Sequence, residues 1–144
     1  MILPDVNLLL FAYNPHAAQH SQARQWWEQT LNGTELIGLT HEVLFGFIRI
    51  ATNARLGAAS IPLSAAHRVV TTWIEQPHCR ILSPGADHFS KVMELMQQSN
   101  SAGPVLSDAI LAAHALAHRA TLCSNDSDFA RFKGLSWKNP LRPI

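Results

Sequence analysis

Four carboxylates stand out in this sequence because each lies where a strand-like apolar run ends or a helix-like run begins. They are Asp5, Glu42, Asp108 and Asp126. In an open parallel α/β sheet the carboxyl ends of the strands meet at one edge, so acids far apart in sequence converge there. Such acids repel one another and raise each other's pKa values, and a hard divalent cation with oxygen ligands relieves the repulsion. The four carboxylates therefore predict a pocket for Mg²⁺ or Mn²⁺.

These acids must be positioned by an alternation of strands and helices. Short strand-like runs occur at 2–4, 36–39, 79–82, 121–124 and 135–137. Apolar stripes with helical spacing lie between them, over 6–13, 20–31, 43–51, 66–74, 89–96 and 109–116. Such alternation is typical of proteins in which helices cover both faces of a mostly parallel sheet. We expect an α/β fold, a three-layer α/β/α sandwich with a central sheet of four to five strands.

Local signals add detail to this expectation. Two helices in a row between the first and second strands depart from a simple βαβ repeat. Pro4 lacks the N–H that a central strand donates, so the first strand must end at Pro4 or stand at a sheet edge. Ser64 and Ser107 are expected to cap the helices that follow them. The polar stretch 98–104 is expected to be a loop within one domain.

Composition places the chain among compact single-domain proteins. Of its 144 residues, 47% are hydrophobic and 15% are charged, which is enough apolar material for a sizeable core. The longest apolar run, 8–12, is too short to span a bilayer, and no basic segment of a secretory signal precedes it. Cys79 and Cys123 are interpreted as buried free thiols. We therefore expect one cytoplasmic domain over 1–144.

The charge balance favours a polyanionic substrate. The net charge of +1 comes from ten acids and eleven Lys and Arg residues. If bound metal compensates the four acids named above, six acids remain to face those eleven bases. A basic surface around a metal-filled acidic pocket suits a phosphodiester. The chain has no CxxC pair, HExxH motif or Gly-rich phosphate loop, so a zinc protease or a P-loop NTPase is unsupported.

Each acid also has an ordinary structural explanation when it is considered alone. Asp and Ser commonly cap helices, and capping alone would explain Asp108. Asp128 is interpreted as a cap or a salt-bridge partner of the turn at 129–132. His41 and His114 lie in the same segments as the acids, but metal-dependent hydrolysis needs no His base. Only the ordered set of four carboxylates favours a functional site.

The order and surroundings of the acids resemble those of the PIN-domain ribonucleases, and most closely the VapC-like toxins of bacterial toxin–antitoxin pairs. The resemblance covers essentially the whole chain. Its motifs are DVNLL at 5–9, WW at 26–27, LTHE at 39–42, SDA at 107–109 and SNDSDFARF at 124–132. Pro4 departs from the aliphatic residue usual before the first acid. The motifs are weak singly, and the specific feature is their order in a chain of this length.

The resemblance implies a PIN-like domain over 1–144 that cuts RNA with Mg²⁺ or Mn²⁺. It assigns catalytic and metal-binding roles to Asp5, Glu42, Asp108 and Asp126. Polar side chains of the same pocket would be Asn7, Thr40, Ser124 and Asp128. The resemblance also implies a homodimer and a small antitoxin protein encoded alongside. Apolar stripes around 26–27 and 45–47 favour the same dimer, because they are richer than one small domain needs.

Two other classes of function remain open. A catalytically silent PIN-like module that binds RNA or protein would be marked by the loss of one acid, and all four are present. A phosphoacceptor receiver needs an Asp after the third strand, where 81–84 offers none. A haloacid-dehalogenase-like phosphatase needs a second Asp two residues after the first, where Asn7 stands.

Overall fold

The computed structural model describes residues 1–142, and a parallel sheet lies at its centre. The five strands are β1 (Ile2–Pro4), β2 (Ile37–Thr40), β3 (Cys79–Leu82), β4 (Thr121–Cys123) and β5 (Trp137–Lys138). Their order in the sheet is β3-β2-β1-β4-β5, and neighbouring strands pair in parallel. The carboxyl ends of the strands therefore lie at one edge, as the sequence predicted.

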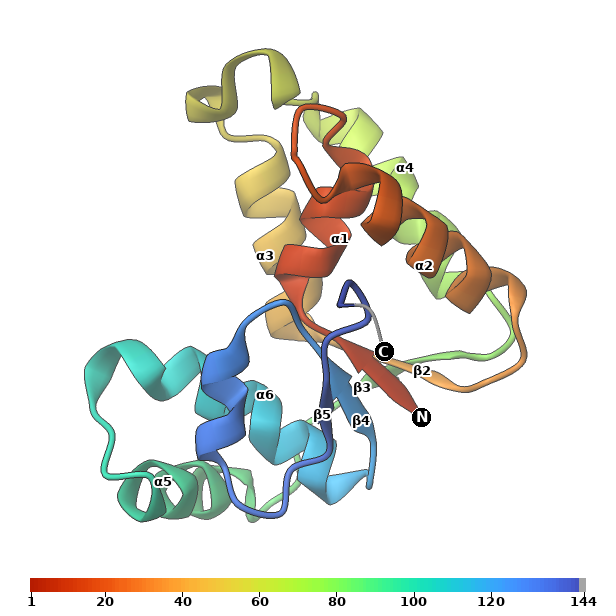
Figure 1. Cartoon of the computed structure of the whole chain (residues 1–144). Coiled ribbons are helices and arrows are strands. Elements are labelled where there is room, and N and C mark those ends of the chain that lie inside the picture. The colour runs from red at the N-terminus through yellow and green to blue at the C-terminus, as the bar shows by residue number, and fades with distance from the viewer. Residues whose placement is uncertain (143–144) are drawn as a thin grey trace.

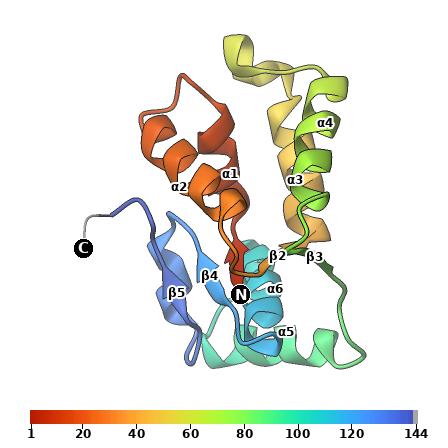
Figure 2. The same ribbon diagram turned by 90° about the vertical axis from the view of Figure 1, so that its right-hand side faces the viewer.

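Helices cover both faces of this sheet. On one side lie α1 (Val6–Tyr13), α2 (His20–Asn32), α3 (His41–Ala51) and α4 (Leu63–Ile74), and on the other α5 (His88–Gln98) and α6 (Leu106–Ala117) (Figures 1 and 2). Short 3-10 turns occur at η1 (Ala54–Ala59), η2 (Gly103–Val105) and η3 (Ser127–Arg131). The predicted three-layer sandwich is confirmed, including the two consecutive helices between β1 and β2.

The position of β1 shows how Pro4 is accommodated. β1 is the central strand and ends at Pro4. The next residue, Asp5, donates its N–H to the carbonyl of Cys123 at 2.8 Å, so the hydrogen bonding toward β4 resumes at once. Of the two alternatives that the sequence left open, the strand end is the one observed.

The two predicted serine caps are wrong. α4 begins at Leu63, one residue before Ser64, because Pro62 already has the extended conformation of a cap, with φ −62° and ψ 152°. α6 begins at Leu106 because η2 runs directly into it, with the Leu106 N–H donating to the carbonyl of Gly103. A preceding turn thus satisfies part of the helix start without any side-chain cap.

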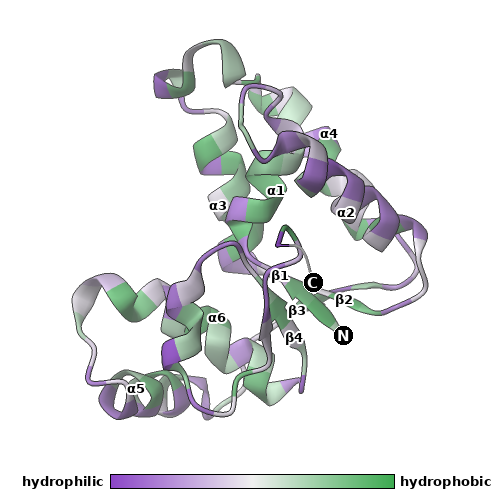
Figure 3. Ribbon diagram, viewed as in Figure 1, coloured by the Kyte–Doolittle hydropathy of each residue, from purple (hydrophilic) through white to green (hydrophobic). Residues whose placement is uncertain are grey.

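An aromatic cluster forms the core between the sheet and helices α1 to α4. Trp73 packs on Phe47 with ring centroids 4.8 Å apart and on Trp27 at 5.6 Å. The indole N–H of Trp73 donates to the Tyr13 hydroxyl at 2.9 Å, which satisfies a polar group that burial would otherwise penalise. Trp27 and Phe47 are therefore core residues, and the prediction that their stripes supply a subunit interface is wrong for both. Figure 3 shows mostly hydrophobic residues in the strands and in α1, and many hydrophilic residues in α2.

Both cysteines are free and buried, as predicted. Burial raises the pKa of the Cys123 thiol to about 11 and also raises that of Cys79. Within residues 1–142, no helix has the length and apolar character needed to cross a membrane.

Candidate active site

Asp5 is held rigidly where β1 passes into α1. Its Oδ1 accepts the Val6 N–H at 2.7 Å, and its Oδ2 accepts the Ser124 hydroxyl at 2.7 Å. The Ser124 oxygen in turn accepts from the Asn7 amide at 3.2 Å and from the Asp126 N–H at 3.0 Å. One donor and two acceptor positions are all that a hydroxyl offers, so Ser124 is fully used. Burial raises the pKa of Asp5, and the hydrogen bonds from Ser124 and Val6 partly oppose that shift.

Asp126 and Asp128 have different roles in the turn after β4. Asp126 caps η3, because its Oδ1 accepts the N–H of Asp128 at 2.8 Å. Asp128 is exposed and pairs with Arg131 at 3.4 Å. The prediction that Asp128 caps this turn is wrong, and its alternative, a salt bridge, is observed. Asp126 comes first in the turn and so meets the free N–H two residues later.

Asp108 lies in the first turn of α6 and is coupled electrostatically to the acids at the strand ends. Burial raises the pKa of its carboxyl group to about 6, and the charges of Asp5 and Asp126 add to the shift. The Arg131 guanidinium opposes it. These mutual effects mean that three of the four predicted acids, from β1, α6 and the turn after β4, share one region at the strand ends.

Glu42 lies in the first turn of α3, whose start is fixed by Thr40. The buried Thr40 hydroxyl oxygen accepts the Val43 N–H at 3.2 Å and caps the helix. The Glu42 side chain is 51% exposed, and its Oε2 lies 3.8 Å from Nε2 of His114. Glu42 is not among the charges that raise the pKa of Asp5 or of Asp108. Glu42 thus approaches His114 of α6 from the start of α3.

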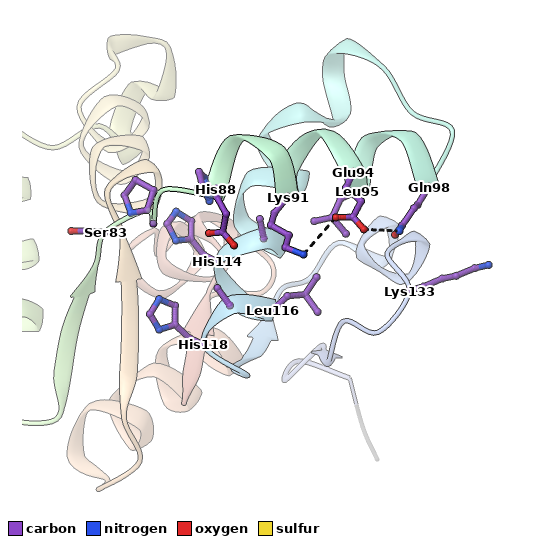
Figure 4. A pocket seen from close by; sticks show the side chains of 15 residues that line it. Ser83, His88, Lys91, Glu94, Leu95, Gln98, His114, Leu116, His118 and Lys133 are labelled. Carbon is purple, nitrogen blue, oxygen red and sulfur yellow. Dashed lines mark hydrogen bonds and ion pairs between the residues drawn. The ribbon is translucent and has the colours of Figure 1, made fainter.

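Two neighbours of the acids were given no role in the site by the sequence analysis. His114 is a buried polar residue on α6, packed on His88 of α5 with ring centroids 4.5 Å apart. Both line a cavity of about 310 Å³ between α5 and α6, which Figure 4 shows together with His118. Arg131 is the cation beside Asp108. Its spacing of three residues from Asp128 was a readable signal for an ion pair, whereas His114 offered only a polar residue within an apolar helix.

The acids suit a cation that keeps its own water. Within residues 1–142, no group of three or more His, Cys, Asp or Glu side chains is arranged to hold a metal ion directly. Mg²⁺ typically keeps several waters and binds through one or two carboxylates. The oxygen-only donors and the raised pKa values of Asp5 and Asp108 fit such an ion, because a nearby positive charge removes the repulsion that raises them.

Comparison with known proteins points in one direction. A family model described as the PIN domain matches residues 2–135. The chain is 43% identical over 142 residues to a Mycobacterium tuberculosis protein named Ribonuclease VapC33, covering 99% of both chains.

Solved structures share the fold at lower identity. VapBC2 from Rickettsia felis, bound to a DNA fragment from its promoter, matches with a TM-score of 0.69 and 20% identity over 96% of this chain and 98% of that one. Mycobacterium tuberculosis VapC20, described as a toxin that cleaves the sarcin–ricin loop, matches with a TM-score of 0.68 and 18% identity. That match covers 90% of this chain and 93% of VapC20.

Proposed function

The chain belongs to the PIN-domain family, and we infer from this membership that it is a divalent-metal-dependent endoribonuclease, the toxin of a VapBC-type toxin–antitoxin pair. The relative that is 43% identical over the full chain is named a ribonuclease. The observation that carries the inference is the grouping of Asp5, Asp108 and Asp126 at the strand ends, where two of the three carboxyl groups have raised pKa values. A pocket of acids that penalises its own ionisation suits a cation and a phosphodiester.

We propose that Mg²⁺ or Mn²⁺ is held by Asp5, Glu42, Asp108 and Asp126, in part through water. When bound, the ion supplies an activated water and neutralises the scissile phosphate. The protein's own contribution is orientation. Ser124 and the Val6 N–H fix both oxygens of Asp5, and Asn7 holds Ser124 in turn.

The remaining predicted pocket residues take supporting parts in this proposal. The Thr40 hydroxyl is committed to the start of α3 and so places Glu42. The exposed pair of Asp128 and Arg131 leaves a guanidinium beside the acids, where it can meet an RNA phosphate in bidentate fashion.

The partners that we propose are an RNA substrate, a cognate small antitoxin and a second copy of the chain, all in the cytoplasm. One of the solved structures that share the fold is described as a toxin–antitoxin complex from Klebsiella pneumoniae, and others are described as VapBC. The free buried thiols are consistent with a reducing compartment.

The test is RNA cleavage by the purified chain with Mn²⁺ or Mg²⁺, in parallel with excess EDTA. Cleavage is expected only with metal, and Asp5→Asn and Asp108→Asn, purified identically, are expected to be inactive. These variants keep side-chain volume and remove a ligand charge, and they also reveal any contaminating nuclease. Cleavage that continues undiminished in EDTA, or that persists in both variants, contradicts the proposal.

Expression in cells tests the toxin role separately. Induction of the wild type is expected to arrest growth, and the same two variants are expected to relieve the arrest at equal protein level. Sequencing the RNA ends produced shortly after induction then identifies the RNA and the bond that are cut. Arrest by the variants at wild-type strength means that toxicity does not come from these carboxylates.

A further inference from the structure

His114 is an unusual residue for its position in the fold. Its side chain is 3% exposed, and its Nε2 has no hydrogen-bond partner among residues 1–142. The other buried residues of α6 are small or apolar: Ala109, Leu111, Ala112, Ala113 and Ala115. A leucine would fill such a site without a polar cost, whereas an unpaired buried nitrogen lowers stability. The imidazole therefore calls for an explanation beyond packing.

The acidic group that approaches this nitrogen is the carboxylate of Glu42, on α3. Oε2 of Glu42 lies 3.8 Å from the His114 Nε2, just beyond hydrogen-bonding distance. Glu42 is half-exposed and has three side-chain torsions, so a small rotation brings its carboxylate within reach. His114 itself has little freedom, because its ring is buried and packed on His88 at 4.5 Å (Figure 4). The rigid partner is the histidine and the movable one is the glutamate.

We propose that His114 is a positioning residue for Glu42: its Nε2–H donates to the Glu42 carboxylate and holds it in the orientation used to bind the divalent cation. This inference rests on the proposed function, because it requires that Glu42 serve the metal. It assigns no metal contact to His114. Carboxylate ligands depend on hydrogen bonds from outside the metal's own shell, and loss of such a partner weakens metal binding about 10- to 100-fold.

A calorimetric titration of the full chain with MnCl₂ tests the proposal without relying on activity. His114→Leu keeps an apolar volume but removes the donor, and it is expected to weaken Mn²⁺ binding about tenfold. His114→Gln can place an amide N–H near the position of Nε2 and is expected to restore most of the affinity. His118→Leu changes an exposed histidine four residues later, at the C-cap of α6, and serves as the matched control, with unchanged affinity expected.

A double-mutant cycle separates positioning from general damage to the fold. If His114 acts through Glu42, then His114→Leu weakens Mn²⁺ binding in the wild type and has no further effect in Glu42→Ala. Should His114→Leu fail to fold, His114→Gln and His114→Asn decide instead. The shorter Asn cannot reach Glu42, so it is expected to bind Mn²⁺ more weakly than the Gln variant.

The possible outcomes separate a failure of this inference from a failure of the proposed metal-dependent function. No Mn²⁺ binding by the wild type overturns both. Binding that Glu42→Ala weakens and His114→Leu leaves unchanged or tightens overturns only the role of His114. An equal loss from His114→Leu with and without Glu42 likewise rejects it, since the effect then does not pass through the carboxylate.

Discussion

Burial, and then the charges of Asp5 and Asp126, oppose the ionisation of Asp108, which predicts how the metal-free protein responds to pH. Its pKa in the fold is about 6, well above the usual 3.8 of an Asp carboxyl group. The folded state therefore binds its proton more tightly than the unfolded chain does. The resulting stability is fully present below pH 3.8 and is lost as the pH rises through about 6.

Asp108→Asn should accordingly stabilise the metal-free protein at pH 7 and not at pH 4. The expected gain in the free energy of unfolding is about 1 kcal/mol in total. This is less than ~1.4 kcal/mol for each unit of the pKa shift would give, because the carboxyl group is partly solvated. Thermal melts in EDTA from pH 4 to 8 measure it, with the exposed Asp87→Asn as a control that stays level. A difference in melting temperature that is the same at every pH would contradict the assignment.

Asp126 combines a capping role with a proposed metal-binding role, and substitutions can separate them. Asp126→Asn keeps a capping oxygen and removes the charge, so cleavage should fall sharply while stability is retained. Asp126→Ala should lose activity and also about 1 kcal/mol of stability, as for a missing cap. Asp128→Ala removes only an exposed ion pair, worth less than ~1 kcal/mol. Cleavage kinetics at saturating Mn²⁺ and thermal melts of each variant measure both effects. An inactive Asp128→Ala together with an active Asp126→Asn would mean that Asp128, and not Asp126, serves the metal.

At the scale of the elements, the start of α3 determines where Glu42 lies. Thr40 is buried and its hydroxyl caps the helix by accepting the Val43 N–H. Thr40→Val keeps the shape and loses the cap, so we expect a loss of about 1–2 kcal/mol. Thr40→Ser keeps the hydroxyl and should cost less. Urea unfolding measures both, and a Val variant as stable as the wild type would show that the cap is dispensable.

Elements were predictable from the sequence to the extent that periodicity encodes them. The strands at 2–4 and 79–82 have the expected bounds, because short apolar runs between helical stripes have few alternatives. The parallel topology was enough to place the acids at the strand ends. It was not enough to predict the direction of each acid's side chain. The turn after β4 is set by the Ser124 hydroxyl and the Asp126 cap, and no spacing rule encodes those hydrogen bonds.

Contacts between elements far apart in the sequence could not be predicted from the sequence either. The approach of Glu42 to His114 depends on how α3 and α6 flank the sheet, which the hydrophobic pattern of either helix leaves open. The same limit explains the error over Trp27 and Phe47. Their stripes looked excessive for one domain, yet four aromatic rings from α1 to α4 fill a single core.

At the scale of the whole molecule, exposed aromatic side chains bear on the proposed homodimer. Phe45 of α3 is 69% exposed and Phe89 of α5 is 77% exposed. A contiguous exposed apolar patch is typical of a surface that another molecule covers, and each of these two side chains is tested as part of one. We expect light scattering to report a dimer at micromolar concentration and the double variant Phe45→Glu, Phe89→Glu to be a folded monomer. A monomeric wild type refutes the dimer, and a dimeric double variant refutes a role for these two side chains in it.

The buried thiol of Cys123 lets the rate of chemical labelling report on the edge of the sheet where Asp5 and Asp126 lie. Alkylating reagents attack the thiolate, which is scarce at neutral pH when the pKa is about 11. Modification of Cys123 therefore requires a transient local opening that exposes its side chain, and its rate reports how often that opening occurs. A cation shared by Asp5 and Asp126 would tie the ends of β1 and β4 together. Mn²⁺ should then slow the alkylation of Cys123 more than that of Cys79, which lies on the edge strand β3.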